Sequence, residues 1–347
     1  MKYSPRKKGL LILTGVVLIG FALFDIIRSR MRGVHVWRTS NGWTCSGNIQ
    51  YDLGYPRTRP ILCGKKLVVV ERCKKGYLIR GFKIIETPMN FIRDNYYITA
   101  LSLANGRKIY RTKLYGQGHP LQVIKIWPWG ENVVVWGYYQ TEPGDNRVTV
   151  VQILNSKGRI INQFGLKVQP TALDQKNNLL ICGSKTFLLP SGLKQPGMNL
   201  MPFVDMATDK KGNLYVNHLS LTGKVWKDYI EKKTPNMPAT IAKYRIEARE
   251  RLWSKKSKTE RGYPRLLRYE DGLLWWAVRD EHMGGLIEER TKWIGGPINV
   301  ETGQFVETER KCDPYRLQTV FGGKSYTVTR KGTKLVVNIA PDKKVAN

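Results

Sequence analysis

Six short apolar runs recur along the chain after residue 60, and each is preceded by a turn of polar residues or glycine. Their first apolar residues are spaced by about 54 residues on average. Runs this short favour β-strands, and helical periodicity is almost absent from the same part of the chain. The runs are Lys66–Val70, Asn132–Trp136, Asn178–Cys182, Gly212–Val216, Gly272–Val278 and Lys334–Ile339.

A second pattern, in which a strand, a glycine turn and another strand follow one another, lies downstream of several of these runs. Apolar residues alternate before each turn and resume soon after it, which is typical of a β-hairpin. Glycine is suited to such turns because it adopts positive φ without steric cost. The turn glycines are Gly106, Gly158, Gly223 and Gly303.

A repeat of roughly 40 to 50 residues built from strands and turns is typical of β-propeller blades. A four-stranded blade cannot bury both of its faces alone, so blades pack around a common axis. We therefore predict an all-β fold, a β-propeller of about six blades (five to seven) preceded by a single N-terminal transmembrane helix. Either Ser325–Thr329 or Leu335–Ile339 is expected to close the ring against a strand near Trp37 to Cys45. A stack of β-sandwich domains is the alternative fold.

The turn at Asp209–Gly212 and the strand that follows it to Val216 resemble the strand starts of bacterial propellers with PQQ-type, or quinoprotein-type, repeats. At this level of the repeat class, residues 60 to 340 resemble a bacterial membrane-anchored β-propeller repeat protein. The resemblance implies the architecture and not the activity of PQQ-dependent dehydrogenases. The chain lacks their pair of neighbouring cysteines and is much shorter than those enzymes.

Two regions depart from the repeat. In residues 227–262 we expect a strand at Thr240–Ile246, a turn into Arg251–Trp253, and an exposed loop at Lys255–Arg261. The connection Lys83–Tyr97 carries Phe91 and Ile92, which are candidates for a docking loop because binding residues concentrate on loops.

Residues 10–27 form an apolar run of 18 residues whose one charged member is Asp25. At about 1.5 Å per residue, a helix of this length is just long enough to cross a bilayer. A cleaved secretory signal and a buried core helix are the alternatives, but the run lacks a small-residue cleavage site and a polar face. The predicted anchor residues are Leu10, Leu11, Ile12, Leu13, Val16, Val17, Leu18, Ile19, Phe21, Leu23, Phe24, Ile26 and Ile27.

This anchor divides the chain into a basic tail (1–9), a transmembrane helix (10–27), a juxtamembrane segment with the first strands (28–60), a propeller (61–341) and a short tail (342–347). Basic residues flank the helix on both sides almost equally, so the positive-inside rule leaves the orientation nearly balanced. We favour the bacterial inner membrane with the bulk of the chain on the periplasmic side. The arginines after the helix, Arg28, Arg30 and Arg32, are candidate interface residues.

The chain carries 58 Lys and Arg against 27 Asp and Glu, a formal net charge of +31. Such a field attracts anionic surfaces. The basic residues are dispersed and no nucleic-acid recognition motif accompanies them, so nucleic acid is not an expected partner. The predicted partners are the bilayer, an integral membrane protein complex and anionic lipid headgroups, to which each nearby Lys or Arg contributes about 1 kcal/mol.

The five cysteines form no C-x-x-C pair, and their odd number leaves at least one thiol free. Cys63 and Cys73 flank the strand at Lys66–Val70 and could form a disulfide in an oxidising compartment. Unpaired, buried cysteines are the favoured interpretation.

The sequence contains one candidate catalytic cluster, Asp280, Glu281 and His282, on a glycine-rich stretch. These residues could act in acid–base chemistry or could lie in a solvated turn. The chain has no H-E-x-x-H, G-x-S-x-G, Walker or C-x-x-C-H motif and only four histidines. We therefore predict no enzyme activity, no catalytic residues, no cofactor and no metal site.

Tryptophans supply the remaining candidate interface. Trp127 and Trp129 precede a turn and are expected to be exposed, whereas Trp275 and Trp276 lie in an apolar run and are expected in the core. Exposed Trp is enriched at interfaces and at the membrane boundary. The sequence favours a membrane-anchored scaffold or accessory subunit of a respiratory, photosynthetic or envelope-assembly complex. An anchored hydrolase or carbohydrate-active propeller, and a receptor for an acidic ligand, are the alternatives.

Overall fold

The computed structural model of the 347-residue chain describes most of the part that follows residue 32. The predicted helix at 10–27 and Arg28, Arg30 and Arg32 lie outside the described residues. Within the described part, no helix is long and apolar enough to cross a membrane. The described ranges are 33–50, 58–73, 77–80, 83–86, 94–141, 146–183, 185–197, 205–209, 211–219, 239–248, 250–256, 263–270, 273–279, 293–304, 306, 310–311 and 316–342.

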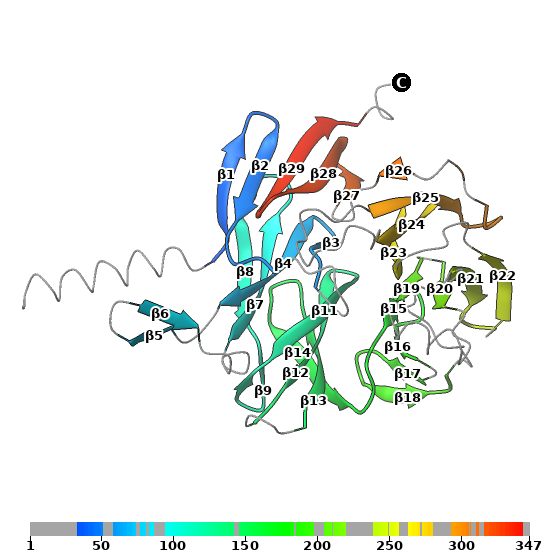
Figure 1. The fold of residues 1–347 in the computed structure, drawn as a ribbon, viewed down its shortest axis with the longest axis horizontal. Coiled ribbons are helices and arrows are strands. Elements are labelled where there is room, and N and C mark those ends of the chain that lie inside the picture. The colour runs from blue at the N-terminus through cyan, green and yellow to red at the C-terminus, as the bar shows by residue number, and fades with distance from the viewer. Residues whose placement is uncertain are drawn as a thin grey trace, which may run out of the picture.

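Five four-stranded antiparallel sheets follow one another along the chain and are called blades 1 to 5 below (Figure 1). The prediction of an all-β propeller is confirmed, with about five blades recognised. Blade 1 comprises β3 (Ile61–Cys63), β4 (Lys66–Cys73), β7 (Asn95–Ser102) and β8 (Lys108–Lys113). Blade 2 comprises β11 (Gln122–Trp129), β12 (Asn132–Tyr139), β13 (Val148–Leu154) and β14 (Ile160–Leu166).

The other three blades have the same strand order. Blade 3 comprises β15 (Ala172–Asp174), β16 (Leu179–Cys182), β17 (Lys185–Leu188) and β18 (Leu193–Gln195). Blade 4 comprises β19 (Asp205–Thr208), β20 (Asn213–Leu219), β21 (Ala239–Arg245) and β22 (Glu250–Lys256). Blade 5 comprises β23 (Tyr263–Glu270), β24 (Leu273–Arg279), β25 (Trp293–Asn299) and β26 (Arg310–Lys311).

A five-stranded sheet, called the terminal sheet below, joins strands from both ends of the described chain (Figure 1). Leu335 pairs with Cys45 and Val337 pairs with Trp43, which confirms that a C-terminal strand meets an early strand of the chain. The strands in spatial order are β1 (His35–Thr39), β2 (Gly42–Ser46), β29 (Lys334–Pro341), β28 (Lys324–Lys331) and β27 (Leu317–Phe321).

All six apolar runs of the sequence form strands, namely β4, β12, β16, β20, β24 and β29. In β4, β12, β16 and β20 the runs are apolar on both faces because buried clusters cover both faces, whereas β29 alternates between buried and more exposed residues. In β4, Val68 and Val70 pack toward blade 2, whereas Leu67 and Val69 pack toward the terminal sheet. A strand buried on both faces has a nearly continuous apolar sequence instead of an alternating one.

Buried apolar clusters fill the spaces between successive sheets. One joins the terminal sheet to blade 1, and four more join blades 1 and 2, 2 and 3, 3 and 4, and 4 and 5. Trp276 is completely buried in the last of these, as predicted, while Trp275 is partly exposed.

The glycine turns are confirmed at Gly106, Gly158 and Gly303, which all have positive φ. Gly223 lies outside the described residues. These turns pack against the preceding sheet, because a Cβ atom at Gly106 would lie 2.5 Å from Val36 and one at Gly158 would lie 2.5 Å from Tyr110.

The irregular region contains both predicted strands, as β21 and β22. The expected exposed loop is wrong at its start, since Lys255 and Lys256 pair with Ile241 and Thr240 at the end of β22.

Two small hairpins lie outside the large sheets. The first is formed by β5 (Tyr77–Arg80) and β6 (Lys83–Glu86), and Figure 1 shows it to one side of blade 1. The second is formed by β9 (Tyr115–Gly116) and β10 (His119–Pro120), which connect blades 1 and 2.

Candidate functional site

The strand registers define two opposite ends of the sheets. At one end, called the turn face, the paired strands are linked by short turns, beside Gly42, Lys66, Asn132, Asn213 and Leu273. The other end, called the loop face, carries the long connections between β4 and β7, β20 and β21, and β24 and β25. The loop-face ends of the strands are marked by Ser46, Cys73, Tyr139, Cys182, Leu219 and Arg279.

The chain enters the terminal sheet at the loop face. His35 pairs with Ser46, so β1 begins at this end of the sheet, just after Gly33. Phe91 and Ile92 lie outside the described residues, but the connection that holds them links the loop-face ends of β4 and β7. The segment with Asp280, Glu281 and His282 also lies outside them and follows the loop-face end of β24.

Trp127 and Trp129 lie at the opposite, turn-face end of blade 2, because Trp129 pairs with Asn132 at the β11–β12 turn. Both are partly buried and pack on the apolar cluster between blades 2 and 3. Trp129 donates a hydrogen bond to Asn178 Oδ1 at 2.7 Å, in blade 3. The structure thus places these two residues at the turn face and gives them a packing role.

A buried carboxylate lies at the loop-face end of blade 1. Glu71 is completely inaccessible to solvent, and Arg111 donates to it from Nη2 at 3.0 Å and from Nε at 3.1 Å. Thr99 Oγ1 donates a further hydrogen bond to the carboxylate. Burial disfavours the charge of Arg111, but the hydrogen bond and the charge of Glu71 outweigh it and raise the pKa of Arg111.

The early part of the chain is attached to the same place. Gln50 N donates to Val70 O at 2.7 Å, and Arg72 N donates to Asn48 O at 2.9 Å, so residues 48–50 extend the ladder along β4. A Cβ atom on Gly33 would lie 3.8 Å from Glu71 Oε2. The Glu71–Arg111 pair therefore lies directly beside the point where the chain arrives from the predicted anchor.

Aromatic rings and cationic groups meet at the loop-face ends of blades 1 and 2. The Arg111 guanidinium lies 3.7 Å from the Tyr97 ring centre, Lys113 Nζ lies 4.5 Å from that of Tyr115, and Arg147 lies 4.5 Å from that of Tyr138. We call these six residues the basic–aromatic patch. Cation–π contacts of this geometry are each worth about 0.5–1 kcal/mol at exposed sites.

The two blades are tied together beneath this patch. Tyr115 O accepts a hydrogen bond from Gln152 Nε2 at 2.6 Å, and His119 stacks on Tyr139 with ring centres 5.9 Å apart. Burial raises the pKa of Tyr138, with the charges of Arg147 and Arg72 acting against it.

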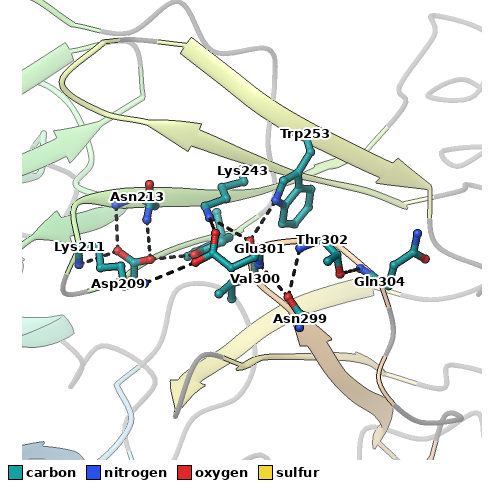
Figure 2. A network of polar contacts seen from close by, with 11 residues as sticks. Asp209, Lys211, Asn213, Lys243, Trp253, Asn299, Val300, Glu301, Thr302 and Gln304 are labelled. Carbon is teal, nitrogen blue, oxygen red and sulfur yellow. Dashed lines mark hydrogen bonds and ion pairs between the residues drawn. The ribbon is translucent and has the colours of Figure 1, made fainter.

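Buried lysines tie blades together at the turn face. Lys243 of blade 4 donates to Val300 O and to Glu301 Oε2 of blade 5, both at 3.0 Å (Figure 2). Trp253 Nε1 donates to the same carbonyl at 3.1 Å. Lys66 donates in the same way to Glu131 O between blades 1 and 2. The partly buried Lys125 donates to Thr171 O between blades 2 and 3, nearer the loop face.

Asp209 organises the turn beside this network. Its carboxylate accepts hydrogen bonds from Lys211 N at 2.8 Å, Asn213 N at 2.9 Å and Tyr215 OH at 2.8 Å (Figure 2). The turn whose sequence resembled a propeller strand start is therefore an Asp-capped hairpin whose carboxylate is satisfied by its own blade.

The two faces differ in how their charges are compensated. At the turn face, lysines form ion pairs with carboxylates, as in Lys66–Glu131, Lys176–Glu247 and Lys211–Glu301. At the loop face, the carboxylates whose side chains are described are Glu71 and Asp94, and each is buried against an arginine. Exposed cations such as Arg147 and Lys185 therefore face solvent there without an acidic partner among the described side chains.

The four cysteines that the structure describes show no sign of a reactive site. Cys45, Cys63, Cys73 and Cys182 are buried and free, so Cys63 and Cys73 do not form a disulfide. Burial raises the pKa of Cys63 to about 11, with the nearby charge of Lys66 acting against it, and it raises the pKa of Cys182 to about 12. Among the described residues, no group of three or more His, Cys, Asp or Glu could hold a metal ion.

Comparison with known proteins finds similarity among solved structures and none among sequences. No protein-family model and no curated protein matches the sequence. Among solved structures, the chain is similar to the β-propeller domain of the trilobed protease from Pyrococcus furiosus, with 12% identity, 84% of each chain covered and a TM-score of 0.41. It is also similar to an uncharacterised protein of Listeria monocytogenes, with 8% identity, 82% of this chain and 75% of that chain covered, and a TM-score of 0.41. The five successive four-stranded sheets define the chain as a β-propeller protein.

Proposed function

We propose that this β-propeller is held at a membrane by an N-terminal helix at 10–27 and acts as a non-enzymatic scaffold or accessory subunit. It would dock on and stabilise a larger membrane protein complex of the respiratory, photosynthetic or envelope-assembly kind. The observation that carries the proposal is topological: the chain enters its first sheet at the loop face, and the long connections of blades 1, 4 and 5 begin and end at this same face.

This arrangement supports docking because loops supported by a rigid scaffold are where binding residues concentrate. The β5–β6 hairpin extends the candidate surface beyond blade 1 (Figure 1). The apolar residues Leu78 and Ile85 are cross-strand partners in this hairpin. The hairpin is a separate two-stranded sheet. A partner that covers this hairpin would stabilise it, since an isolated two-stranded hairpin is marginally stable.

The proposal includes the terminal sheet as a sixth blade with quinoprotein-type repeat geometry. Its innermost strand β27 would lie beside β3 of blade 1, with which it shares a buried cluster. Strands from both ends of the described chain would then hold the ring together.

The test is affinity purification from native membranes in mild detergent through a C-terminal tag, followed by mass spectrometry. Asp342 N bonds to Gly323 O at the turn-face end of β29, so a tag placed there points away from the proposed docking face. A stoichiometric set of integral membrane proteins is the expected result. Recovery of the chain alone would contradict the scaffold proposal.

A matched pair of variants locates the docking surface. Leu78→Ser with Ile85→Ser should reduce recovery of the partners by about tenfold or more, because apolar anchors dominate interface energetics. Ile160→Ser with Ile161→Ser changes two exposed apolar residues near the turn face and should leave recovery unchanged. Equal loss in both variants, or in neither, would contradict docking through the hairpin.

A hydrolytic function is the second candidate, favoured by the position of Asp280, Glu281 and His282 after the loop-face end of β24. Replacing the three residues by alanine should abolish any hydrolase activity found in the purified chain. Unchanged activity would remove these residues from consideration.

A further inference from the structure

We infer that the basic–aromatic patch binds the anionic headgroups of membrane lipids and thereby holds the propeller with its loop face against the bilayer. This inference rests on the proposed anchor, and it adds the lipid class, the residues and the orientation of the domain.

The first support is the length of the tether. The predicted helix ends at residue 27 and the described chain begins at Gly33, so five residues lie between them. A chain of five residues spans at most roughly 18 Å. Gly33 lies beside Glu71, the ion-pair partner of Arg111, so the patch starts where the tether arrives. The anchor would therefore keep the loop face close to the headgroups.

The second support is the chemistry of the patch. Arginine and lysine recognise phosphate groups, and tyrosine is enriched at the boundary between membrane and water. The pairs Arg111–Tyr97, Lys113–Tyr115 and Arg147–Tyr138 place both residue types together on two neighbouring blades. Arg147 and Tyr115 are exposed, so both can contact a surface laid over this end of the sheets.

The third support is the difference in charge between the two faces. Near the patch, Glu71 and Asp94 are buried and paired, so they do not present negative charge to an anionic surface. At the turn face, Glu131, Glu247 and Glu301 are exposed and paired with lysines. An anionic bilayer at the patch therefore meets no exposed carboxylate among the described side chains.

The test uses the full chain in lipid nanodiscs made either of phosphatidylcholine alone or of phosphatidylcholine with 30% phosphatidylglycerol. Hydrogen exchange is measured for the segments 108–116 and 146–149 and, as an internal control, for the turn-face segment 155–160. We expect the first two segments to exchange at least about fivefold more slowly in the anionic discs than in the neutral discs. This factor corresponds to the attraction of one basic residue to an anionic surface. The difference should disappear in 0.5 M salt.

Two double variants complete the design. Lys113→Ala with Arg147→Ala should remove the lipid dependence, and both side chains lie outside the Glu71 ion pair. Lys157→Ala with Arg159→Ala removes the same charge from an exposed turn at the other face and should preserve the lipid dependence.

Equal exchange in both kinds of disc would overturn the inference, and so would protection confined to the turn-face segment. Protection that requires addition of the co-purified complex, in either lipid, would assign the patch to a protein partner and overturn the lipid assignment. Failure of the chain to enter the discs, read separately by size-exclusion chromatography, would overturn the anchor and the proposed function together.

Discussion

At the scale of single residues, Glu71 is a completely buried carboxylate paired with an arginine. It lies in the interior of the propeller, where an isolated carboxylate would be very unfavourable, and three hydrogen-bonding groups from Thr99 and Arg111 compensate it. Removing one partner of a buried ion pair destabilises the folded protein by more than the pair itself stabilises it, because the other charge remains buried without compensation.

Glu71→Gln should therefore lower the free energy of unfolding by roughly 3 kcal/mol, since it leaves Arg111 without its carboxylate. Urea denaturation of the full chain in detergent, followed by tryptophan fluorescence, measures the change. The matched control is Glu247→Gln, which breaks a solvent-exposed pair with Lys176 and should leave stability unchanged. Equal effects of the two substitutions would contradict the role given to Glu71.

A second residue-scale prediction concerns pH and the junction of blades 4 and 5. The hydrogen bond from Lys243, together with its charge, holds the pKa of Glu301 below its ordinary value of 4.5. Folding lowers the pKa of this carboxylate, so its ionised form stabilises the folded protein. The stabilisation is complete when the pH is above the pKa of the unfolded state. It is lost as the pH falls through the pKa of the folded state.

The melting temperature of the wild type should therefore exceed that of Glu301→Gln at pH 6, and the difference should shrink progressively below about pH 4.5. Differential scanning fluorimetry from pH 3 to pH 7 measures both. A difference that stays constant across this range would show that the ionised form of Glu301 contributes nothing to stability.

At the scale of elements, the glycine turns of the outer hairpins lock each sheet to the one before it. The turn at Gly106 packs against Val36 and Trp43 of the terminal sheet, where an added Cβ atom would lie 2.5 Å and 2.9 Å from their side chains. Trp43 is completely buried there and donates a hydrogen bond from Nε1 to Leu103 O at 2.8 Å.

Gly106→Ala should consequently destabilise the protein by about 1–3 kcal/mol more than Gly332→Ala, because overpacking adds to the cost of positive φ. Gly332 also has positive φ, but a Cβ atom there would contact nothing within 4 Å. Chemical denaturation of both variants gives the comparison. Similar losses of stability in the two variants would show that the Gly106 turn is not tightly packed against the terminal sheet.

The strands were predictable because strand burial leaves a local pattern in the sequence. Runs such as Asn132–Trp136 and Gly272–Val278 are apolar on both faces, and glycine marks the turns at Gly158 and Gly303. The contacts between Glu71 and Arg111, forty residues apart, and between Lys243 and Glu301, fifty-eight apart, leave no local pattern. The packing of the partly buried Trp127 and Trp129 against blade 3 also leaves no local pattern, since their neighbours there are distant in the sequence.

At the scale of the whole molecule, the propeller has one face of short turns with exposed carboxylates and another with long connections, where the described carboxylates are buried. Part of the high positive charge is used internally, because Lys66, Lys125 and Lys243 donate to backbone carbonyls of the next blade. The remainder is available to attract an anionic surface. Under the proposed orientation, that surface lies on the side where the chain enters the terminal sheet beside Gly33.

The measurement that tests this account most directly is cross-linking of lysines in native membranes, with the cross-linked peptides identified by mass spectrometry. We predict that loop-face lysines such as Lys113 and Lys185 cross-link to integral membrane proteins, whereas turn-face lysines such as Lys157 and Lys324 do not. Intermolecular cross-links confined to the turn-face lysines would contradict docking through the loop face.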